Sequence, residues 1–381
     1  MTRSTTFPPR PLDLKGRRHE LSTLTAILRR TASTPTVLVG AGGSGKSMLA
    51  CALGHRLAPF FPGGIHWFRV GVWDHRTLLE MLALRFGTGR DGVLPALRAH
   101  LDRRGRSLIV LDNHENDRAM SRFLEALRGC PVTWVLTARR CLLTGVGLFP
   151  VVAPLSTSAR QAFPAVAGLT RLLRWNPLAL SIADALVGSR AASVVVLRRW
   201  LVDQGVERIG VMADEDDIAE VRLLVEWAWR RLDPEARRLM AVLAHVQGDH
   251  VDAGSLHLLA RTRPRRAGGL TVLRRWQLVQ EPLANRFALH AVVRRAVAGR
   301  TRFSGQRFFD HYMRLLERQP DRLQLEQSHL FAAMDHAHDA SDMAGLLRVE
   351  RLLDAMAADH NGQRAGQVVE STSVPSAVQN S

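Results

Sequence analysis

Residues 40–47 read Gly-Ala-Gly-Gly-Ser-Gly-Lys-Ser, and this stretch decides the fold. It follows Thr36 to Val39, which predict a short buried strand, and it precedes a helical pattern from Met48 to Leu57. Glycines at this spacing let the backbone curl so that consecutive N–H groups point at phosphate oxygens, at the positive end of the following helix. GxxxxGK[ST] between a strand and a helix therefore predicts a phosphate-binding loop.

The loop predicts roles for its own residues. Lys46 would reach the β- and γ-phosphates of a nucleoside triphosphate, and Ser47 would ligate Mg²⁺. The alternative is a flexible glycine linker, which has no need of one of the only two lysines in the chain. The residues expected to contact the nucleotide here are Gly40, Ala41, Gly42, Gly43, Ser44, Gly45, Lys46, Ser47 and Met48.

A phosphate loop needs a carboxylate to hold the metal, delivered from the end of a neighbouring buried strand. Ser107 to Asp112 supplies it with four consecutive apolar residues before the acid. Many P-loop ATPases place a second acid directly after the first, whereas Asn113 follows here and the next acid is Glu115. Glu115 is a candidate base, and the alternative is a solvated carboxylate at a helix start. The sequence therefore predicts slow or conditional hydrolysis.

More strands are expected at residues 66–70, 132–137 and 149–152. Strands that alternate with helical stretches predict a parallel sheet flanked by helices. Arg139 follows one of these strands, where a guanidinium can face a γ-phosphate and neutralise transferred charge. The alternative for Arg139 is a surface arginine in an arginine-rich chain.

Six segments in a fixed order carry a resemblance to a known family. They are residues 16–21 (GRRHEL), 61–67 (FPGGIHW), 108–115 (LIVLDNHE), 136–139 (LTAR), 176–180 (NPLAL) and 286–290 (RFALH). They resemble the GRExEL, second-strand, VLDNxE, TSR, GLPLAL and MHD motifs of the NB-ARC branch of the STAND class of signal-transduction P-loop NTPases. The resemblance spans residues 16 to about 300 and is closest to the bacterial AP-ATPase-like regulators.

The resemblance implies roles for further residues. Gly16 and Arg17 open the segment that packs against adenine in the family, and Pro177 takes the position of the proline that lies against the base. His290 takes the position of the histidine that contacts the ADP β-phosphate in the closed switch. The alternative for His290 is a residue that merely opens the next helix. The sequence departs from the family at Trp175-Asn176, where a glycine is expected before the leucine, and at Ala291, in place of the MHD aspartate.

The motifs and the resemblance together imply ATP or ADP and Mg²⁺ as ligands. The catalytic candidates are Lys46, Asp112, Arg139 and Glu115; the metal candidates are Ser47 and Asp112; the further nucleotide contacts are Gly16, Arg17, Pro177 and His290.

The remainder of the chain predicts helices. Helical pieces around residues 253–260 and 270–276, a wing-like stretch at 278–287 and a helix from Ala291 predict a winged-helix domain. Between Arg261 and Arg302 there are eleven arginines and one acid, a local charge of +10 that could grip a phosphate backbone. Amphipathic helices after residue 302 resemble the start of a helical-repeat sensor, too short for three stacked repeats. We therefore expect the sensor to be truncated or supplied by another protein.

The predicted fold class is an α/β P-loop NTPase, a parallel sheet flanked by helices, followed by all-α helical and winged-helix domains and a short helical-repeat-like segment. The expected limits are an N-terminal arm at 1–15, a nucleotide-binding domain at 16–155, a helical subdomain at 156–215, a winged-helix domain at 216–302, a helical segment at 303–360 and a disordered tail at 361–381.

Composition narrows the function classes. The net charge is +17, but 50 of the 52 basic residues are arginines, so part of the charge reflects a general bias toward arginine. No apolar run is long enough to span a membrane, and the first fifteen residues lack the apolar stretch of a signal peptide. The three cysteines form no metal-type spacing, which favours reduced thiols in a cytoplasm.

The sequence thus predicts a nucleotide-dependent conformational switch in signal transduction, with slow ATP hydrolysis. Its expected partners are an adenine nucleotide, other copies of the chain in the ATP state, and an unidentified effector or sensor protein, with no membrane. Three alternatives stay open. They are a DNA-binding transcriptional regulator that uses the arginine-rich winged helix, a nucleotide-binding scaffold without turnover, and a P-loop kinase for a small molecule, which would have no use for the downstream motifs.

Overall fold

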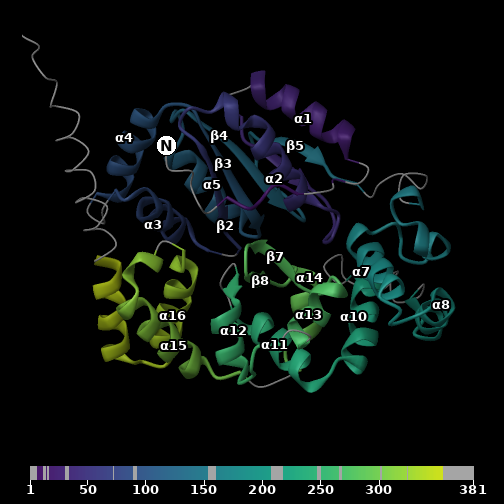
Figure 1. Cartoon of the computed structure of the whole chain (residues 1–381). Coiled ribbons are helices and arrows are strands. Elements are labelled where there is room, and N and C mark those ends of the chain that lie inside the picture. The colour runs from purple at the N-terminus through teal and green to yellow at the C-terminus, as the bar shows by residue number, and fades with distance from the viewer. Residues whose placement is uncertain are drawn as a thin grey trace, which may run out of the picture.

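The structure, a computed structural model, contains a five-stranded parallel sheet with the strand order β2-β3-β4-β1-β5 (Figure 1). The strands are β1 (Thr36–Val39), β2 (Ile65–Arg69), β3 (Ser107–His114), β4 (Val132–Ala138) and β5 (Gly147–Pro150). The described residues are 7–11, 14, 17–30, 34–71, 73–88, 92–152, 160–206, 218–246, 250–265, 268–300, 303–323 and 325–354. The predicted α/β P-loop fold class is confirmed, with the last strand beginning two residues earlier than expected.

Helices cover both faces of the sheet, because successive side chains of a buried strand point to opposite sides. In β3, Leu108 belongs to a core cluster with side chains of α1 and α2, whereas Ile109 belongs to the cluster that holds α3, α4 and α5. Phe7, in the predicted N-terminal arm, is buried in the first cluster, and its ring lies 5.5 Å from that of Trp67. The helices are α1 (Arg18–Arg30), α2 (Lys46–Leu57), α3 (His75–Phe86), α4 (Val93–Arg104) and α5 (Asp117–Ala126).

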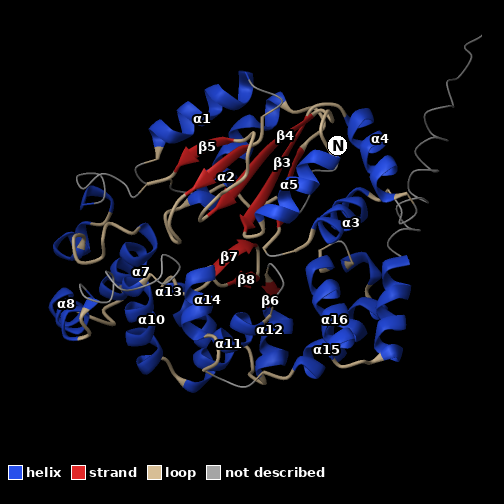
Figure 2. Ribbon diagram, turned by 180° about the vertical axis from the view of Figure 1, so that it is seen from behind, coloured by secondary structure: helices blue, strands red, loops and turns tan. Residues whose placement is uncertain are grey.

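The remaining described residues are mostly helical and lie in an arc along the edge of the sheet where its strands end (Figures 1 and 2). The first unit of the arc holds a 3₁₀ segment (Pro164–Leu169), α7 (Pro177–Gly188) and α8 (Val194–Asp203). The predicted domain limits near residues 155, 215 and 302 fall outside the described residues and stay predictions, as does the tail at 361–381.

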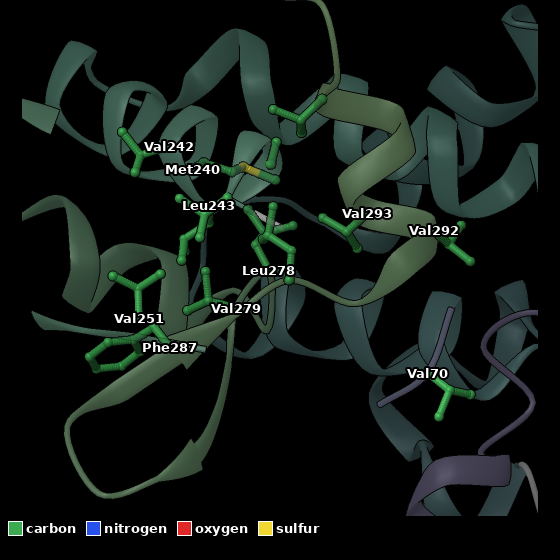
Figure 3. Close-up of a cluster of buried hydrophobic side chains, with 14 of the residues drawn as sticks. Val70, Met240, Val242, Leu243, Val251, Leu278, Val279, Phe287, Val292 and Val293 are labelled. Atoms are coloured by element: carbon green, nitrogen blue, oxygen red, sulfur yellow. The ribbon is translucent and has the colours of Figure 1, made fainter. Parts of the chain in front are cut away.

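Helices and a small antiparallel sheet form the middle of the arc, in the segment predicted as a winged helix, and are called the winged-helix unit below. Its three-stranded antiparallel sheet has the order β6-β8-β7, so the wing pairs with a short strand, β6, that the sequence did not predict. Figure 3 shows the core of this unit, in which side chains of α11 meet those of the wing and of α14. The elements are α10 (Ala219–Arg231), α11 (Pro234–His245), β6 (Val251–Asp252), α12 (Ala253–Ala260), α13 (Gly269–Arg275), β7 (Gln280–Leu283), β8 (Arg286–Ala288) and α14 (Ala291–Val297).

A buried ion pair joins the winged helix to the last unit, which comprises α15 (Gly305–Arg318), α16 (Gln327–Asp339) and a helix at 343–354. Both guanidinium nitrogens of Arg286 donate to the two carboxylate oxygens of Glu326, at 2.7 and 2.6 Å, and Arg322 donates to the same carboxylate. Burial alone would raise the pKa of Glu326, but hydrogen bonds from His329 and Arg286 hold it well below its usual range. This unit also touches the sheet domain, where Gln327 donates to the Met81 carbonyl oxygen.

No helix among the described residues is both long and apolar enough to cross a bilayer.

Replacing Glu326 with alanine should destabilise the protein by about 3–5 kcal/mol, because it leaves the buried Arg286 charge without its carboxylate. The matched control is Glu317→Ala, whose partner Arg348 is exposed, and it should cost less than about 1 kcal/mol. Urea unfolding measures both. The double variant Arg286→Met/Glu326→Leu should recover most of the loss, and equal costs for the two single variants would contradict this role of the pair.

Candidate functional site

The glycine loop is shaped by backbone angles that only glycine adopts freely. Gly43 and Gly45 have φ values of +73° and +93°, and the turn they make places Lys46 as the first residue of α2. A Cβ atom at Gly45 would meet nothing within 4 Å, so this part of the loop is open. The Ser44 hydroxyl is buried without a hydrogen-bond partner among the described residues. An unpartnered buried hydroxyl and open space beside a helix N-terminus fit a bound phosphate.

Lys46 lies across its own loop. Its Nζ donates to the carbonyl oxygens of Gly40 and Ala41, at 2.7 and 2.8 Å. Burial lowers the pKa of Lys46 to about 8, an effect that the Asp112 carboxylate opposes and the Arg139 charge reinforces. A phosphate would restore the charge that burial disfavours, and the ammonium group would exchange neutral carbonyl partners for an anion.

The two residues predicted to bind Mg²⁺, Ser47 and Asp112, are in direct contact. Ser47 Oγ donates to Asp112 Oδ1 at 2.7 Å, and Thr137 Oγ1 donates to the same oxygen at 2.6 Å. Asp112 lies in β3 and Thr137 in the adjacent β4, so the sheet itself sets this geometry. A hydroxyl and a carboxylate side by side provide the oxygen ligands that Mg²⁺ takes together with substrate phosphates. Ser47 and Asp112 therefore fit the metal that the loop implies.

The residue after Asp112 turns away from the sheet pattern. Asn113 has φ +61° at an irregularity in the pairing of β3 with β4, and its side-chain amide donates to Glu115 Oε1 at 2.9 Å. Glu115 is exposed and does not line the cavity described below. This position fits the solvated-carboxylate alternative better than that of a general base.

Asn176 connects the loop to the helical unit. Its Oδ1 caps α7 by accepting from the backbone N–H groups of Leu178 and Ala179, and its Nδ2 donates to the Gly42 carbonyl oxygen at 3.1 Å. The preceding Trp175, where the resembling motif has glycine, has φ +58°, in the left-handed region that favours glycine. Trp175-Asn176 is a departure from the family motif in sequence, but in the structure Asn176 contacts the glycine loop directly.

The winged-helix unit closes the site from the other side. A Cβ atom at Gly42 would lie 2.8 Å from side-chain atoms of Ile218 and Val292, so only glycine fits between the two units. His290 caps α14, since its Nδ1 accepts from the Val292 N–H at 3.3 Å. The helix-opening alternative for His290 is thus realised in the fold, and it does not exclude a second role toward a ligand.

Between these units lies a cavity of about 330 Å³. Residues from the sheet domain, the helical unit and the winged helix all line it, so its contents would touch three parts of the chain. Its apolar wall includes Leu14, Met48, Phe163, Pro177, Leu178, Leu278 and Leu289. Its polar and charged wall includes Arg17, Ser44, Lys46, Ser47, Arg69, Asp112, Asn113, Thr137, Arg139, Ser181, Gln277, Gln280 and His290.

Positive charge surrounds His290. Enclosure by the protein lowers the pKa of His290 to about 3, and the charges of Arg69, Lys46 and Arg139 act in the same direction. The imidazole is therefore neutral at pH 7 and can donate or accept a hydrogen bond. An excess of cations over the single carboxylate of Asp112 prepares the cavity for a polyanion.

Most of the predicted site residues come together here. Arg17 lines the cavity and donates to the Ser44 carbonyl oxygen at 2.7 Å, while Gly40 and Ala41 contribute through the carbonyl groups that hold Lys46. Gly16 lies outside the described residues. Sequence reasoning missed Arg69, Thr137 and Asn176, although Arg69 ends the strand that precedes the Asp112 strand along the chain, a position that could have indicated it.

The fold is shared with a solved structure. The Signal Transduction ATPase with Numerous Domains (STAND) protein with a tetratricopeptide repeat sensor from Pyrococcus horikoshii superposes with a TM-score of 0.59. The match is 16% identical and covers 94% of this chain and 56% of the other. The chain has the fold of a STAND ATPase. The fold implied by the sequence resemblance is confirmed.

The chain is also similar in sequence to a regulatory protein. The regulatory protein AfsR of Streptomyces griseus is 24% identical over 302 residues, which are 72% of this chain and 31% of AfsR. The chain thus spans about a third of AfsR and just over half of the STAND protein. No protein-family model matches the chain.

The low pKa of His290 predicts an acid-sensitive fold. In the unfolded chain His290 has its ordinary pKa of about 6.5, whereas in the fold its pKa is about 3. The free energy of unfolding that this residue contributes is therefore fully present above pH 6.5 and is lost as the pH falls toward 3. In the wild type we expect the free energy of unfolding to fall by about 1 kcal/mol per pH unit, after screening by solvent in the cavity. This slope should be flatter in His290→Gln. Thermal unfolding between pH 7 and 4.5 measures it. The exposed control His338→Gln should keep the wild-type slope, and equal slopes in all three proteins would contradict the assignment.

Proposed function

We propose that this STAND-fold chain is an adenine-nucleotide switch in signal transduction, which binds ATP or ADP with Mg²⁺ and changes conformation with the nucleotide. The observation that supports it most is the composition of the cavity wall. The glycine loop and Asp112 come from one unit and His290 from another, so a nucleotide that bridges them links its own chemistry to the position of the winged helix. A ligand shifts such an equilibrium only by its differential affinity for the two states.

Different residues of the cavity wall would contact different parts of the nucleotide. The loop and Lys46 would hold the β-phosphate, Pro177 would contact the base, and Arg139 at the end of β4 would respond to a γ-phosphate. His290 would contact a diphosphate and favour the closed arrangement. The metal, held by Ser47 and Asp112, would neutralise charge on the phosphates. A third phosphate adds bulk and charge at the end of the cavity that His290 occupies, which favours release of the winged helix.

Slow turnover is part of the proposal. No carboxylate follows Asp112 directly, and the side-chain amide of Asn113 donates to Glu115, which is exposed and does not line the cavity. With no strong base to orient water, hydrolysis would reset the switch slowly. The alternative of a scaffold without turnover stays open and is separated from a slow ATPase by the turnover assay below.

Assembly, partners and location complete the proposal. We expect the ATP-bound form to self-associate and to act on an effector or sensor protein, in keeping with AfsR being a regulatory protein and the Pyrococcus horikoshii protein carrying a repeat sensor. We also expect a cytoplasmic location, where the free thiols of Cys51, Cys130 and Cys141 would stay reduced.

The DNA-binding alternative has less support. Arg286 is buried against Glu326 and Arg300 pairs with Glu226, two acids outside residues 261–302, so part of the +10 charge is neutralised within the chain. Residues of the wing and of the start of α14 line the cavity proposed for the nucleotide. A kinase for a small molecule would leave these contacts without a purpose.

The freshly purified protein should carry close to one equivalent of adenine nucleotide, mainly ADP, and Lys46→Ala should carry little. Denaturation followed by ion-exchange chromatography of the supernatant measures both. Arg76→Ala, at an exposed arginine far from the loop in sequence, is the control and should retain the nucleotide. Wild-type protein that is empty and has no affinity for Mg²⁺-ATP would overturn the proposal.

Radiolabelled ATP bound to the wild type should be hydrolysed at a rate well below the ~1 s⁻¹ lower end of kinase turnover. Asp112→Asn should abolish this, because the metal loses its carboxylate. If ATP survives equally long on both proteins, the scaffold alternative replaces the slow ATPase.

A further inference from the structure

We propose that Arg69 contacts the terminal phosphate of a bound nucleoside triphosphate and so discriminates triphosphate from diphosphate. The inference rests on the proposed function and names a residue of the same cavity for which neither the motifs nor the resemblance gives a role.

The position of Arg69 is set by the sheet. It is the last residue of β2 and pairs in register with Asp112 of β3, and the next residue, Val70, donates its N–H to the Asp112 carbonyl oxygen at 2.9 Å. Neighbouring strands lie about 4.8 Å apart, so the backbone of Arg69 is one strand away from the carboxylate expected to hold the metal. The side chain lines the cavity.

Arg69 is a half-buried cation of the cavity wall. Among the residues that the structure describes, no carboxylate or carbonyl group lies within bonding distance of its guanidinium. Arg69 and His290 line the same cavity, and the charge of Arg69 is among the causes that lower the pKa of His290. A half-buried guanidinium that faces a cavity and lacks an acid is suited to bind an anion in two places at once.

The strand order indicates which phosphate it would meet. The glycine loop follows β1, and the order β2-β3-β4-β1 places Arg69 at the far end of this row, beyond Asp112. A diphosphate held by the loop would not reach across the strand ends as far as β3 and β2. A third phosphate would extend toward Asp112 and Arg69, which lie at those strand ends. Arg69 should therefore contribute to triphosphate affinity and little to diphosphate affinity.

Nucleotide affinity of Arg69→Gln tests the inference. We expect a non-hydrolysable ATP analogue with Mg²⁺ to bind at least about tenfold more weakly than to the wild type, as for loss of a hydrogen-bonded charge, and ADP with Mg²⁺ to change less than threefold. Calorimetric titration of stripped protein measures both. Arg69→Lys keeps the charge without the fork and should lie between the two, and Arg76→Gln, an exposed arginine, should match the wild type.

The outcomes separate this inference from the proposed function. Wild-type protein that binds neither nucleotide overturns the proposed function. Wild-type protein that binds both, together with an Arg69→Gln variant that weakens both equally or neither, overturns only the role of Arg69. Wild-type protein that binds ADP but no triphosphate analogue also overturns it, because no terminal phosphate then reaches Arg69. If Arg69→Gln fails to fold by circular dichroism, Arg69→Lys decides by the ratio of the two affinities.

Discussion

The arrangement of the whole chain depends on close contact around one residue, Gly42. Asn176 of the helical unit donates to its carbonyl oxygen, and Ile218 and Val292 occupy the space that a side chain would need. Three units thus meet at a single turn of backbone. A movement of that turn would displace the helical unit and the winged-helix unit together. In the proposed switch, a ligand of the loop would act on distant parts of the chain through these contacts.

The electrostatics of the cavity complement this contact. Lys46, Arg69 and Arg139 line the same cavity as the neutral His290, and the carboxylate of Asp112 accepts hydrogen bonds from Ser47 and Thr137. Without an anion the cations disfavour protonation of the ring, and Lys46 itself loses part of its basicity to burial. A polyphosphate would relieve both effects. The number of phosphates would determine how many of the positive charges between the glycine loop and Arg69 are neutralised.

The last unit restrains the same movement from a distance. The Arg286–Glu326 pair joins it to the wing, and Gln327 joins it to the carbonyl of Met81 in α3. The ion pair is buried and bidentate, whereas Gln327 gives α3 a neutral hydrogen bond. Opening of the winged helix should therefore carry α15 and α16 with it and break the weaker contact with α3.

The sequence predicted the parts that local patterns determine. GxxxxGK[ST] after an apolar run placed the loop, β1 and α2, and the strand ending in Asp112 placed the metal carboxylate, because buried parallel strands have strong composition signals. It missed contacts between distant segments. The sequence shows that the Arg69 strand precedes the Asp112 strand, but not that β2 and β3 are neighbours in the sheet. The contact of Asn176 is with a loop 134 residues earlier in the chain. The two-residue strand β6 has no pattern of its own and exists because β8 pairs with it. Glu115 was predicted as a base because it is the next acid after Asp112. The backbone turns at Asn113, and Glu115 is exposed instead of lining the cavity.

Hydrogen–deuterium exchange of residues 280–297 in two nucleotide states is the most direct test of the switch. These residues hold the wing, His290 and α14, and their amides should exchange slowly with ADP bound, because the winged helix then stays packed against Gly42. A non-hydrolysable ATP analogue with Mg²⁺ should raise exchange across this segment while the strands of the sheet stay protected. Equal protection in the two states would contradict the account, since the nucleotide would then occupy the cavity without moving the unit that closes it.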